Sequence, residues 1–301
     1  MQLKRSRELK NIMKSSLLKL LFYLLFILSV NFTVFSQIKT TFRFEWGNDT
    51  LNGEFFEKTS MHIPVKLYND TTTYYFQFDT GSDASFLYNG DTLYKKIIKN
   101  FTSKEGIQTN LGKLQLFSKE SNTIYTENGK THIGTIGADF LKDKKVEIDF
   151  KNQNITILTN YDRLEYQTIP MEKSYGRPII TLNHQNHEYK FLFDTGSSLF
   201  ELWTTKKTWK KWTDANSNIK GFPISSWGKI NIAYRAPLKT QLTTSLCNSL
   251  IFKTIWYNSN KKFDTEFKKM KLSGIIGNKP FLETIILLDF ESKLIGVKNC
   301  R

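Results

Sequence analysis

The sequence is poor in the residues that build metal and phosphate sites. Among its 301 residues are only two cysteines and four histidines, and the histidines are not spaced as in a metal-binding motif. We therefore expect His62, His132, His184 and His187 to be solvent-exposed, and we expect no metal and no other cofactor. A phosphate-binding glycine loop and a nucleophile elbow are also missing, which excludes the chemistries that depend on these motifs.

Basic residues outnumber acidic ones, but they form no nucleic-acid-binding module. The formal net charge is +15, and about +10 remains when residues 1–36 are left out. The lysines are scattered along the sequence, so we expect a solvated surface and no nucleic-acid partner. Weak attraction to acidic substrates or to anionic membrane surfaces is the alternative. With 40% apolar and 24% charged residues, the composition is that of a globular protein.

Long apolar runs are confined to the N-terminus, which has the layout of a secretory signal peptide. A basic region precedes the apolar run from Leu20 to Val30, and the small residues Val34 and Ser36 stand before Gln37. We expect residues 1–36 to be cleaved, which predicts an exported protein that is periplasmic, on the outer surface or secreted. The alternative is an uncleaved membrane anchor, but the run is short for about 30 Å of hydrocarbon. Membrane contact is expected only through an uncleaved leader.

The two cysteines leave two interpretations open. Export into an oxidising compartment would allow a disulfide between Cys247 and Cys300. Alternatively, Cys300 is simply part of a frayed C-terminus. Neither cysteine lies near the leader, which excludes a lipid-modified N-terminal cysteine.

One short motif occurs twice in the chain. "FQFDTGSD" covers Phe76–Asp83 and "FLFDTGSS" covers Phe191–Ser198. Each copy follows a predicted strand, a polar turn and a second strand in which aromatic residues alternate with other residues. These aromatic residues, which we expect on one strand face, are Tyr74, Phe76 and Phe78 in the first copy and Tyr189, Phe191 and Phe193 in the second.

The repeat continues downstream. "IGTIGADFLKDKKVEIDFKNQNITI" and "LSGIIGNKPFLETIILLDFESKLIGV" share an Ile-Gly turn, a short Phe-Leu helix and a closing β-hairpin. The spacing from Gly137 to Asp149 is 12 residues, as is that from Gly277 to Asp289. We interpret the two aspartates as structural turn residues. Agreement in order and spacing predicts an internal duplication.

The duplication predicts an all-β protein of two lobes. The N-terminal lobe is expected to cover residues 37–165 and the C-terminal lobe residues 166–301, with the boundary near residues 160–176. Residues 37–58 precede the repeat and add either an outer strand or a short inhibitory segment. The second copy is longer in its middle, where Trp203, Trp209, Trp212, Trp227 and Trp256 lie. These tryptophans either pack the core of the second lobe or line a substrate cleft.

Two equivalent lobes can bring the two motifs face to face. A pseudo-two-fold axis would place Asp79 next to Asp194, and two carboxyl groups so close share one proton. Such a pair holds a base, which activates water, and an acid, which protonates the oxyanion and the leaving amine.

The neighbouring motif residues fit supporting roles. Hydroxyls of the threonines can tie each turn to the other lobe, glycines allow the backbones to approach, and serines can hydrogen-bond the outer carboxylate oxygens. The supporting residues are Thr80, Gly81, Ser82, Thr195, Gly196 and Ser197.

These motifs resemble those of the aspartic proteases. "FDTGSD" and "FDTGSS" are similar to the catalytic turns of pepsin-like and retroviral-type enzymes, and "GTIGADFL" and "SGIIGNKPFL" are similar to the apolar-apolar-Gly element that follows. The resemblance covers most of residues 60–160 and 175–298. It implies a β-barrel pair with pseudo-two-fold symmetry, Asp79 and Asp194 as the catalytic pair, and peptide hydrolysis without metal or covalent intermediate. The short lobes look closest to two retroviral-type protomers fused in tandem.

The resemblance predicts an exported aspartic endopeptidase that acts as a monomer on peptide or protein substrates. A catalytically inactive peptide-binding protein of the same fold is one alternative, and a structural envelope protein whose turns only cap strands is another. The Tyr-Gly flap hairpin of pepsin-like enzymes is missing between Leu87 and Ile133. Glu105–Phe117, with turn points at Gly106 and Gly112, is the segment that we expect to form the flap.

Overall fold

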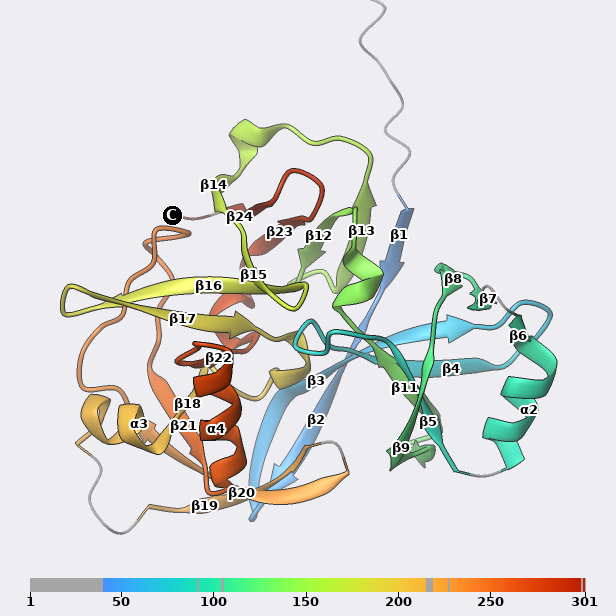
Figure 1. Cartoon of the computed structure of the whole chain (residues 1–301), viewed down its shortest axis with the longest axis horizontal. Helices are drawn as coiled ribbons and strands as arrows, with labels where there is room; N and C mark the ends of the chain where they lie inside the picture. The colour runs from blue at the N-terminus through green and yellow to red at the C-terminus, as the bar shows by residue number, and fades with distance from the viewer. Residues whose placement is uncertain are drawn as a thin grey trace, which may run out of the picture. The chain divides into compact units, whose positions relative to one another are not determined.

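Figure 1 shows the computed structural model, which describes residues 40–300 except positions 91, 104, 105, 215–218, 227 and 299. The described chain is mostly β-structure, which confirms the expected all-β class. The signal peptide predicted for residues 1–36 lies outside the described residues. Among the residues that the structure does describe, no helix has the length and apolar character needed to cross a membrane.

The first half of the chain forms a seven-stranded sheet around the first Asp-Thr-Gly-Ser turn. Strand β4 runs parallel to β11, which pairs antiparallel with β5. In spatial order the strands are β2 (Glu45–Leu51), β3 (Glu54–Lys66), β4 (Thr73–Phe78), β11 (Lys130–Ile136), β5 (Phe86–Asn89) and β9 (Phe117–Thr123), with β10 (Tyr125–Glu127) paired to β11. Helix α2 (Thr92–Phe101) is followed by a small sheet of β6 (Thr102–Ser103), β7 (Gly106–Thr109) and β8 (Gly112–Leu114).

The second half repeats this pairing around the second turn. Strand β17 runs parallel to β22, which pairs antiparallel with β18. The eight strands follow the order β15 (Glu172–Ser174), β16 (Arg177–His184), β17 (His187–Phe193), β22 (Gly274–Ile276), β18 (Leu202–Thr204), β21 (Thr254–Asn258), β20 (Lys229–Pro237) and β19 (Gly221–Ser226). Helix α3 (Lys206–Trp212) follows β18 in the chain, and α4 (Lys261–Lys269) follows β21.

A third sheet joins strands from both halves. Its order is β1 (Thr40–Arg43), β13 (Asn154–Leu158), β12 (Lys145–Asp149), β23 (Ile285–Asp289), β24 (Leu294–Lys298) and β14 (Gln167–Pro170). The two closing hairpins meet at its centre, where β12 pairs antiparallel with β23. The open question about residues 37–58 is thereby answered for the described part, since Thr40–Arg43 is an outer strand and Glu45–Leu51 joins the first sheet.

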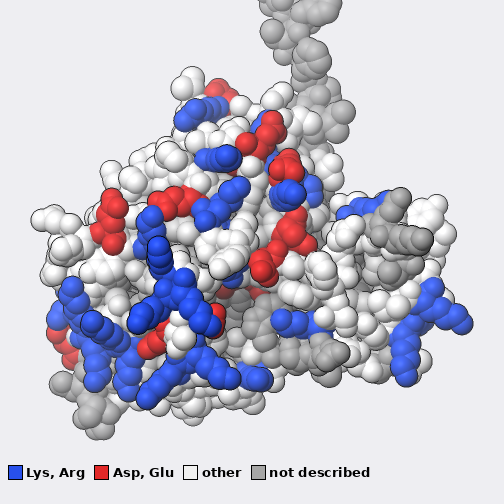
Figure 2. All heavy atoms as spheres, in the orientation of Figure 1, with Lys and Arg blue, Asp and Glu red and all other residues white. Residues whose placement is uncertain are grey.

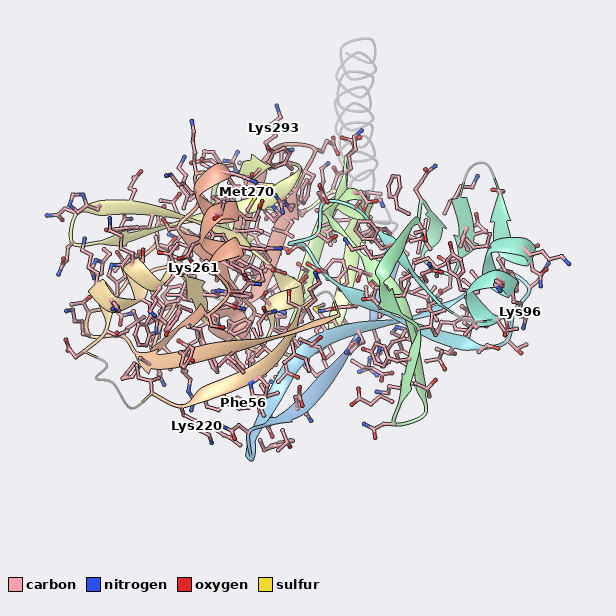
Figure 3. All side chains as sticks on the ribbon, turned by 60° about the horizontal axis from the view of Figure 1, so that its bottom comes forward. Phe56, Lys96, Lys220, Lys261, Met270 and Lys293 are labelled. Carbon is pink, nitrogen blue, oxygen red and sulfur yellow. A yellow bond between two sulfur atoms is a disulfide. The ribbon has the colours of Figure 1, made fainter. Side chains whose placement is uncertain are left out.

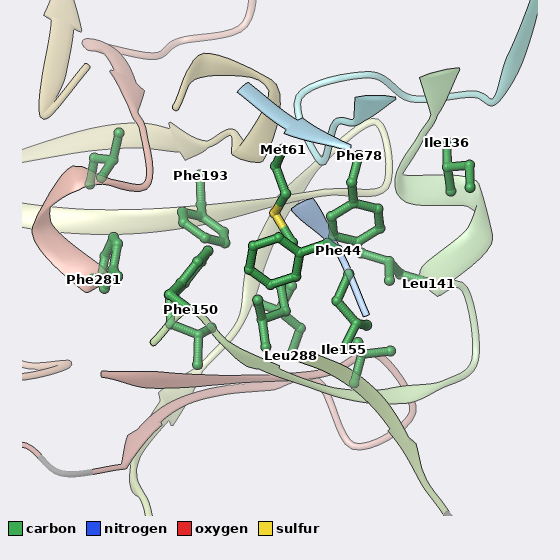
Figure 4. Close-up of a cluster of buried hydrophobic side chains, with 14 of the residues drawn as sticks. Phe44, Met61, Phe78, Ile136, Leu141, Phe150, Ile155, Phe193, Phe281 and Leu288 are labelled. Carbon is green, nitrogen blue, oxygen red and sulfur yellow. The ribbon is translucent and has the colours of Figure 1, made fainter. Parts of the chain in front are cut away.

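The alternating aromatic residues face the core, as the sequence predicts. Tyr74, Phe76 and Phe78 are buried in β4, and Phe191 and Phe193 are buried in β17, while Tyr189 is half-buried. Figure 4 shows Phe78 and Phe193 in one apolar cluster with side chains from both halves. Burial of such side chains is the main source of stability of the fold.

The turns and short helices of the repeat also agree with the prediction. Each Ile-Gly turn leads into a short 3₁₀ helix, η2 (Ala138–Leu141) or η5 (Lys279–Phe281). Asp149 Oδ1 accepts a hydrogen bond of 2.9 Å from the Asn152 amide, and Asp289 Oδ1 accepts one of 2.7 Å from the Ser292 amide. The two aspartates therefore hold the closing hairpin turns.

Cys247 and Cys300 form a disulfide with their Cα atoms 5.6 Å apart. Of the two interpretations that the sequence left open, the structure has the bonded one. Cys247 is buried, and the bond connects the segment before β21 to the chain end after β24.

The lysines are less evenly distributed than the sequence suggested. Figure 2 shows Lys and Arg side chains gathered over α3 and α4. The exposed lysines of these helices are Lys206, Lys207, Lys210 and Lys211 on α3 and Lys261, Lys262, Lys268 and Lys269 on α4. This face is the one on which a weak attraction to anions would act.

Candidate active site

Each Asp-Thr-Gly-Ser turn begins where a central strand ends. Asp79 follows β4 directly, and its amide donates a hydrogen bond of 2.9 Å to the Ile136 carbonyl of the parallel strand β11. Asp194 follows β17, and its amide donates one of 2.9 Å to the Ile276 carbonyl of β22. Both aspartates are thus held by the last residue of the neighbouring parallel strand.

The threonines cross between the two turns. The Thr80 hydroxyl donates to the Phe193 carbonyl (2.7 Å) and accepts from the Thr195 amide (3.1 Å). The Thr195 hydroxyl donates to the Phe78 carbonyl (2.8 Å) and accepts from the Thr80 amide (3.0 Å). Both side chains are fully buried. The prediction that the threonines tie each turn to the other half is confirmed.

The glycines lie against the carboxyl group of the opposite turn. A Cβ atom on Gly81 would be 2.3 Å from Asp194 Cγ, and a Cβ atom on Gly196 would be 2.5 Å from Asp79 Cγ. No side chain fits at such distances, so only glycine allows this approach. The two carboxyl groups, which come from residues 115 positions apart, therefore lie at one place.

The two serines differ, although the sequence gave them the same role. The Ser197 hydroxyl donates to Asp194 Oδ2 (2.9 Å), as expected, and the Gly196 amide donates to Oδ1 (2.8 Å). The expectation is wrong for the Ser82 side chain, because its hydroxyl donates to the Ala84 carbonyl (2.7 Å). Ser82 contacts the carboxyl group through its amide, which donates to Asp79 Oδ1 (2.9 Å).

The environment favours the protonated form of Asp79. Burial raises the pKa of Asp79 well above its usual value of 3.8, and the negative charge of Asp194 and a hydrogen bond with it raise it further. The amides of Ser82 and Gly81 act in the opposite direction but are outweighed. A proton held between two buried carboxyl groups is the expected state of such a pair.

Two residues that the sequence did not point to also hold the turns across the halves. Gln77 Nε2 donates to the Gly196 carbonyl (3.1 Å), and Arg177 Nη1 donates to the Gly81 carbonyl (3.1 Å). Gln77 could have been found, because it lies on the strand face opposite Phe76 and Phe78, where a polar residue points away from the core. Nothing in the repeat marks Arg177.

Asp79 and Asp194 lie in a cavity of about 890 Å³. Its walls include residues of the β2–β3 hairpin, of β10, of the β19–β20 hairpin and of α4. The expected flap at Glu105–Phe117 is wrong, since none of its described residues lines the cavity. The glycines do form a hairpin there, but it pairs with the chain after β3, where the Tyr68 amide donates to the Gln108 carbonyl (2.9 Å).

The tryptophans divide between the two roles that the sequence left open. Trp209, Trp212 and Trp256 are buried in the core. Trp203 is also buried, yet it lines the cavity. Trp227 lies outside the described residues.

The expectation of solvent-exposed histidines is wrong for three of the four. His132 and His184 are buried and His62 is half-buried, whereas His187 is exposed. Burial is the largest cause that lowers the pKa of His62 to about 3 and that of His132 to about 4. Aromatic neighbours account for part of this burial, as Tyr125 stacks on His132 at 4.6 Å. Within the described part of the chain, no group of three or more His, Cys, Asp or Glu could hold a metal ion.

No family model matches the chain, and no curated protein matches it either. What the site can do is therefore argued from its geometry.

Proposed function

We propose that the protein is an aspartic endopeptidase that hydrolyses peptide bonds with a water molecule activated between Asp79 and Asp194. The observation that carries this proposal is the reciprocal packing of the two turns. Each carboxyl group lies against the glycine of the other turn, and each threonine hydroxyl bonds the other strand end. Turns that only cap strands have no need for this exchange.

The proposal includes a two-lobed fold with pseudo-two-fold symmetry. It is supported by the equivalent strand pairings, in which β4, β11 and β5 correspond to β17, β22 and β18. Exchange of the two halves also exchanges β12 with β23 and β1 with β14 in the third sheet. An axis between β12 and β23 would pass between the two aspartates.

In the proposed mechanism the pair acts as base and acid in turn. Asp79 holds the shared proton, and Asp194 removes a proton from the water that attacks the scissile carbonyl carbon. Asp79 donates its proton to the carbonyl oxygen, which gives a neutral tetrahedral intermediate. The proton gained by Asp194 then passes to the leaving amine, and a proton returns from the intermediate to Asp79 as the carbonyl forms again. No covalent bond to the protein is needed.

The surroundings suit a peptide substrate. The cavity of about 890 Å³ is large enough for several residues of an extended chain, and it opens onto both aspartates. Export of the protein, proposed from the leader sequence, would bring it to peptides and proteins outside the cytoplasm.

The test is cleavage of a mixed peptide library by the purified protein and by Asp79→Asn, Asp194→Asn and the double variant. We expect each single variant to lose about 10⁴-fold in kcat and the double variant to be no worse, because the two residues act as a unit. Asp83→Asn is the matched control, since this exposed carboxylate belongs to the same turn and lines the same cavity. It should retain most of the activity.

Two results would contradict the proposal. One is a single variant that keeps more than about a tenth of the activity. The other is binding of library peptides without any hydrolysis by the unaltered protein, which would identify the alternative, a catalytically inactive peptide-binding protein.

A further inference from the structure

The wall of the cavity differs sharply between the two halves of the chain. On the first half most of the lining is polar: Asn48, Thr59, Ser60, His62, Gln77 and Tyr88. On the second half a cluster of apolar residues, which includes Leu192, Leu199, Phe200, Trp203, Phe263 and Ile275, lies beside polar residues such as Ser225, Ser226, Glu266 and Lys269. We call the polar set of the first half the polar wall and the apolar cluster of the second half the apolar wall.

The contrast is built into equivalent positions of the repeat. Gln77 and Leu192 each stand two residues before a catalytic aspartate. In the first sheet Gln77 lies between His62 and Thr135 on the neighbouring strands. In the second sheet Leu192 lies between Ile179 and Ile275. Three positions next to each aspartate are thus polar in one half and apolar in the other.

The polar wall is fixed by hydrogen bonds among its own residues and to neighbouring groups. His62 Nε2 and the Ser60 hydroxyl are 2.7 Å apart, and the Tyr88 and Thr135 hydroxyls are 2.7 Å apart. Gln77 is held by its bond to the Gly196 carbonyl. Because the pKa of His62 is lowered, this histidine stays neutral and can both donate and accept. An apolar side chain placed here would exclude water from these polar groups and offer no hydrogen bond in return.

The apolar wall is a continuous hydrophobic cluster. Trp203 packs against Phe200 with ring centroids 5.1 Å apart and against Phe263 at 4.6 Å. Phe263 comes from α4, which begins at Lys261 and ends next to Met270, both labelled in Figure 3. Leu51, the apolar lining residue of the first half, joins this same cluster. A large apolar side chain can be buried against this wall without losing a hydrogen bond.

An extended peptide that crosses the aspartate pair must face both walls at once. In an extended chain successive side chains point to opposite sides, so the two residues that flank the scissile bond point toward different walls. We propose that the enzyme is selective for peptide bonds between a large apolar residue and a polar residue, the apolar side chain lying on the apolar wall and the polar one on the polar wall. This inference rests on the proposed endopeptidase activity.

The test uses fluorogenic peptides that differ only in the two residues flanking the central bond. The pairs are Phe-Gln, Gln-Phe, Phe-Leu and Gln-Ser. We expect one order of the Phe and Gln pair to exceed both Phe-Leu and Gln-Ser by about tenfold or more in kcat/KM. Equal or faster cleavage of Phe-Leu would overturn the inference while leaving the endopeptidase proposal intact.

Two variants assign the preference to the walls. Phe263→Gln should lower kcat/KM for the preferred peptide about tenfold, whereas Phe55→Gln, a change at an exposed residue outside the cavity lining, should not. His62→Leu should raise the relative rate for Phe-Leu, whereas His187→Leu should not. Thermal unfolding of each variant verifies folding, and the wild-type preference is decisive even if a variant fails to fold.

If no peptide is cleaved, the endopeptidase proposal fails and the inference is decided by binding of the same four peptides, measured by calorimetry. Tighter binding of one order of Phe and Gln than of Phe-Leu would support the two walls. Equal binding of all four peptides, or no binding, would overturn them.

Discussion

The hydroxyl of Thr80 is fully buried, so water cannot replace the two hydrogen bonds that it makes across the site. Thr80→Val has nearly the same shape but leaves the Phe193 carbonyl and the Thr195 amide without this partner. We expect a loss of about 1–3 kcal/mol in the free energy of unfolding for Thr80→Val, measured by denaturant titration. Thr80→Ser keeps the hydroxyl and should lose less. Equal losses for Val and Ser would show that the methyl group, not the hydrogen bonds, stabilises this contact.

A second prediction at the residue scale concerns pH. The folded protein holds the Asp79 proton more tightly than the unfolded chain, because the pKa of Asp79 is raised by burial and by Asp194. The associated stability is fully present below pH 3.8, the usual pKa, and is lost as the pH rises through the raised value. Asparagine stays neutral, so Asp79→Asn should gain in Tm relative to the unaltered protein between pH 4 and pH 8.

Asp83→Asn is the control for this pH series, since its carboxylate is exposed. Its Tm should follow that of the unaltered protein at every pH. A difference between Asp79→Asn and the unaltered protein that stays constant from pH 4 to pH 8 would contradict the assignment of the shared proton to Asp79.

Sequence reasoning succeeded at those residues whose role follows from local pattern and repetition. The eight motif residues were found because two short motifs recur with matched neighbours, and all eight meet in the structure. The role of the Ser82 hydroxyl was wrong because its choice between Asp79 and the Ala84 carbonyl depends on a local rotamer. Arg177 was missed because its partner, Gly81, is 96 residues away and its repeat counterpart is not an arginine.

At the scale of elements, strands were easier to predict than the position of a hairpin. The alternating aromatic residues predicted β4 and β17, and Gly106 and Gly112 predicted a flap hairpin within Glu105–Phe117. Its place was wrong because long-range pairing with the chain after β3 decides where it lies. The helices did leave a signal: Phe263 and Phe267 are four residues apart on α4, and Trp209 and Trp212 are three apart on α3.

The disulfide gives a prediction for the end of β24. The bond closes a loop with a sequence separation of 53 residues, and removing it should cost about 4 kcal/mol in the free energy of unfolding. The double variant Cys247→Ser, Cys300→Ser is compared with the unaltered protein by denaturant titration, with and without reductant. Reductant should bring the unaltered protein close to the variant and leave the variant unchanged. Detection of two free thiols by mass spectrometry in protein purified without reductant would contradict the bond.

At the scale of the whole molecule, the third sheet is what the repeat alone could not reveal. Each closing hairpin was predicted from its own copy of the repeat. The pairing of β12 with β23 joins the two copies, however, and it has no sequence signature. In the observed register Val146 faces Leu288 and Ile148 faces Ile286, and all four side chains are buried. This apolar seam holds the two halves together independently of the threonine contacts.

Because both aspartates belong to one chain, we expect an active monomer. Linkage of the two halves gives them an effective concentration of about millimolar or more, far above any assay concentration. Specific activity should therefore stay constant over a dilution series from about 10 μM to 1 nM, which lies far below that value. Light scattering should give the mass of one chain.

Mixing Asp79→Asn with Asp194→Asn is the matched control. If sites formed between chains, the mixture would regain activity because some sites would combine two intact aspartates. We expect no recovery, and recovery, or activity that falls on dilution together with a dimer, would show that Asp79 and Asp194 are not partners within one chain.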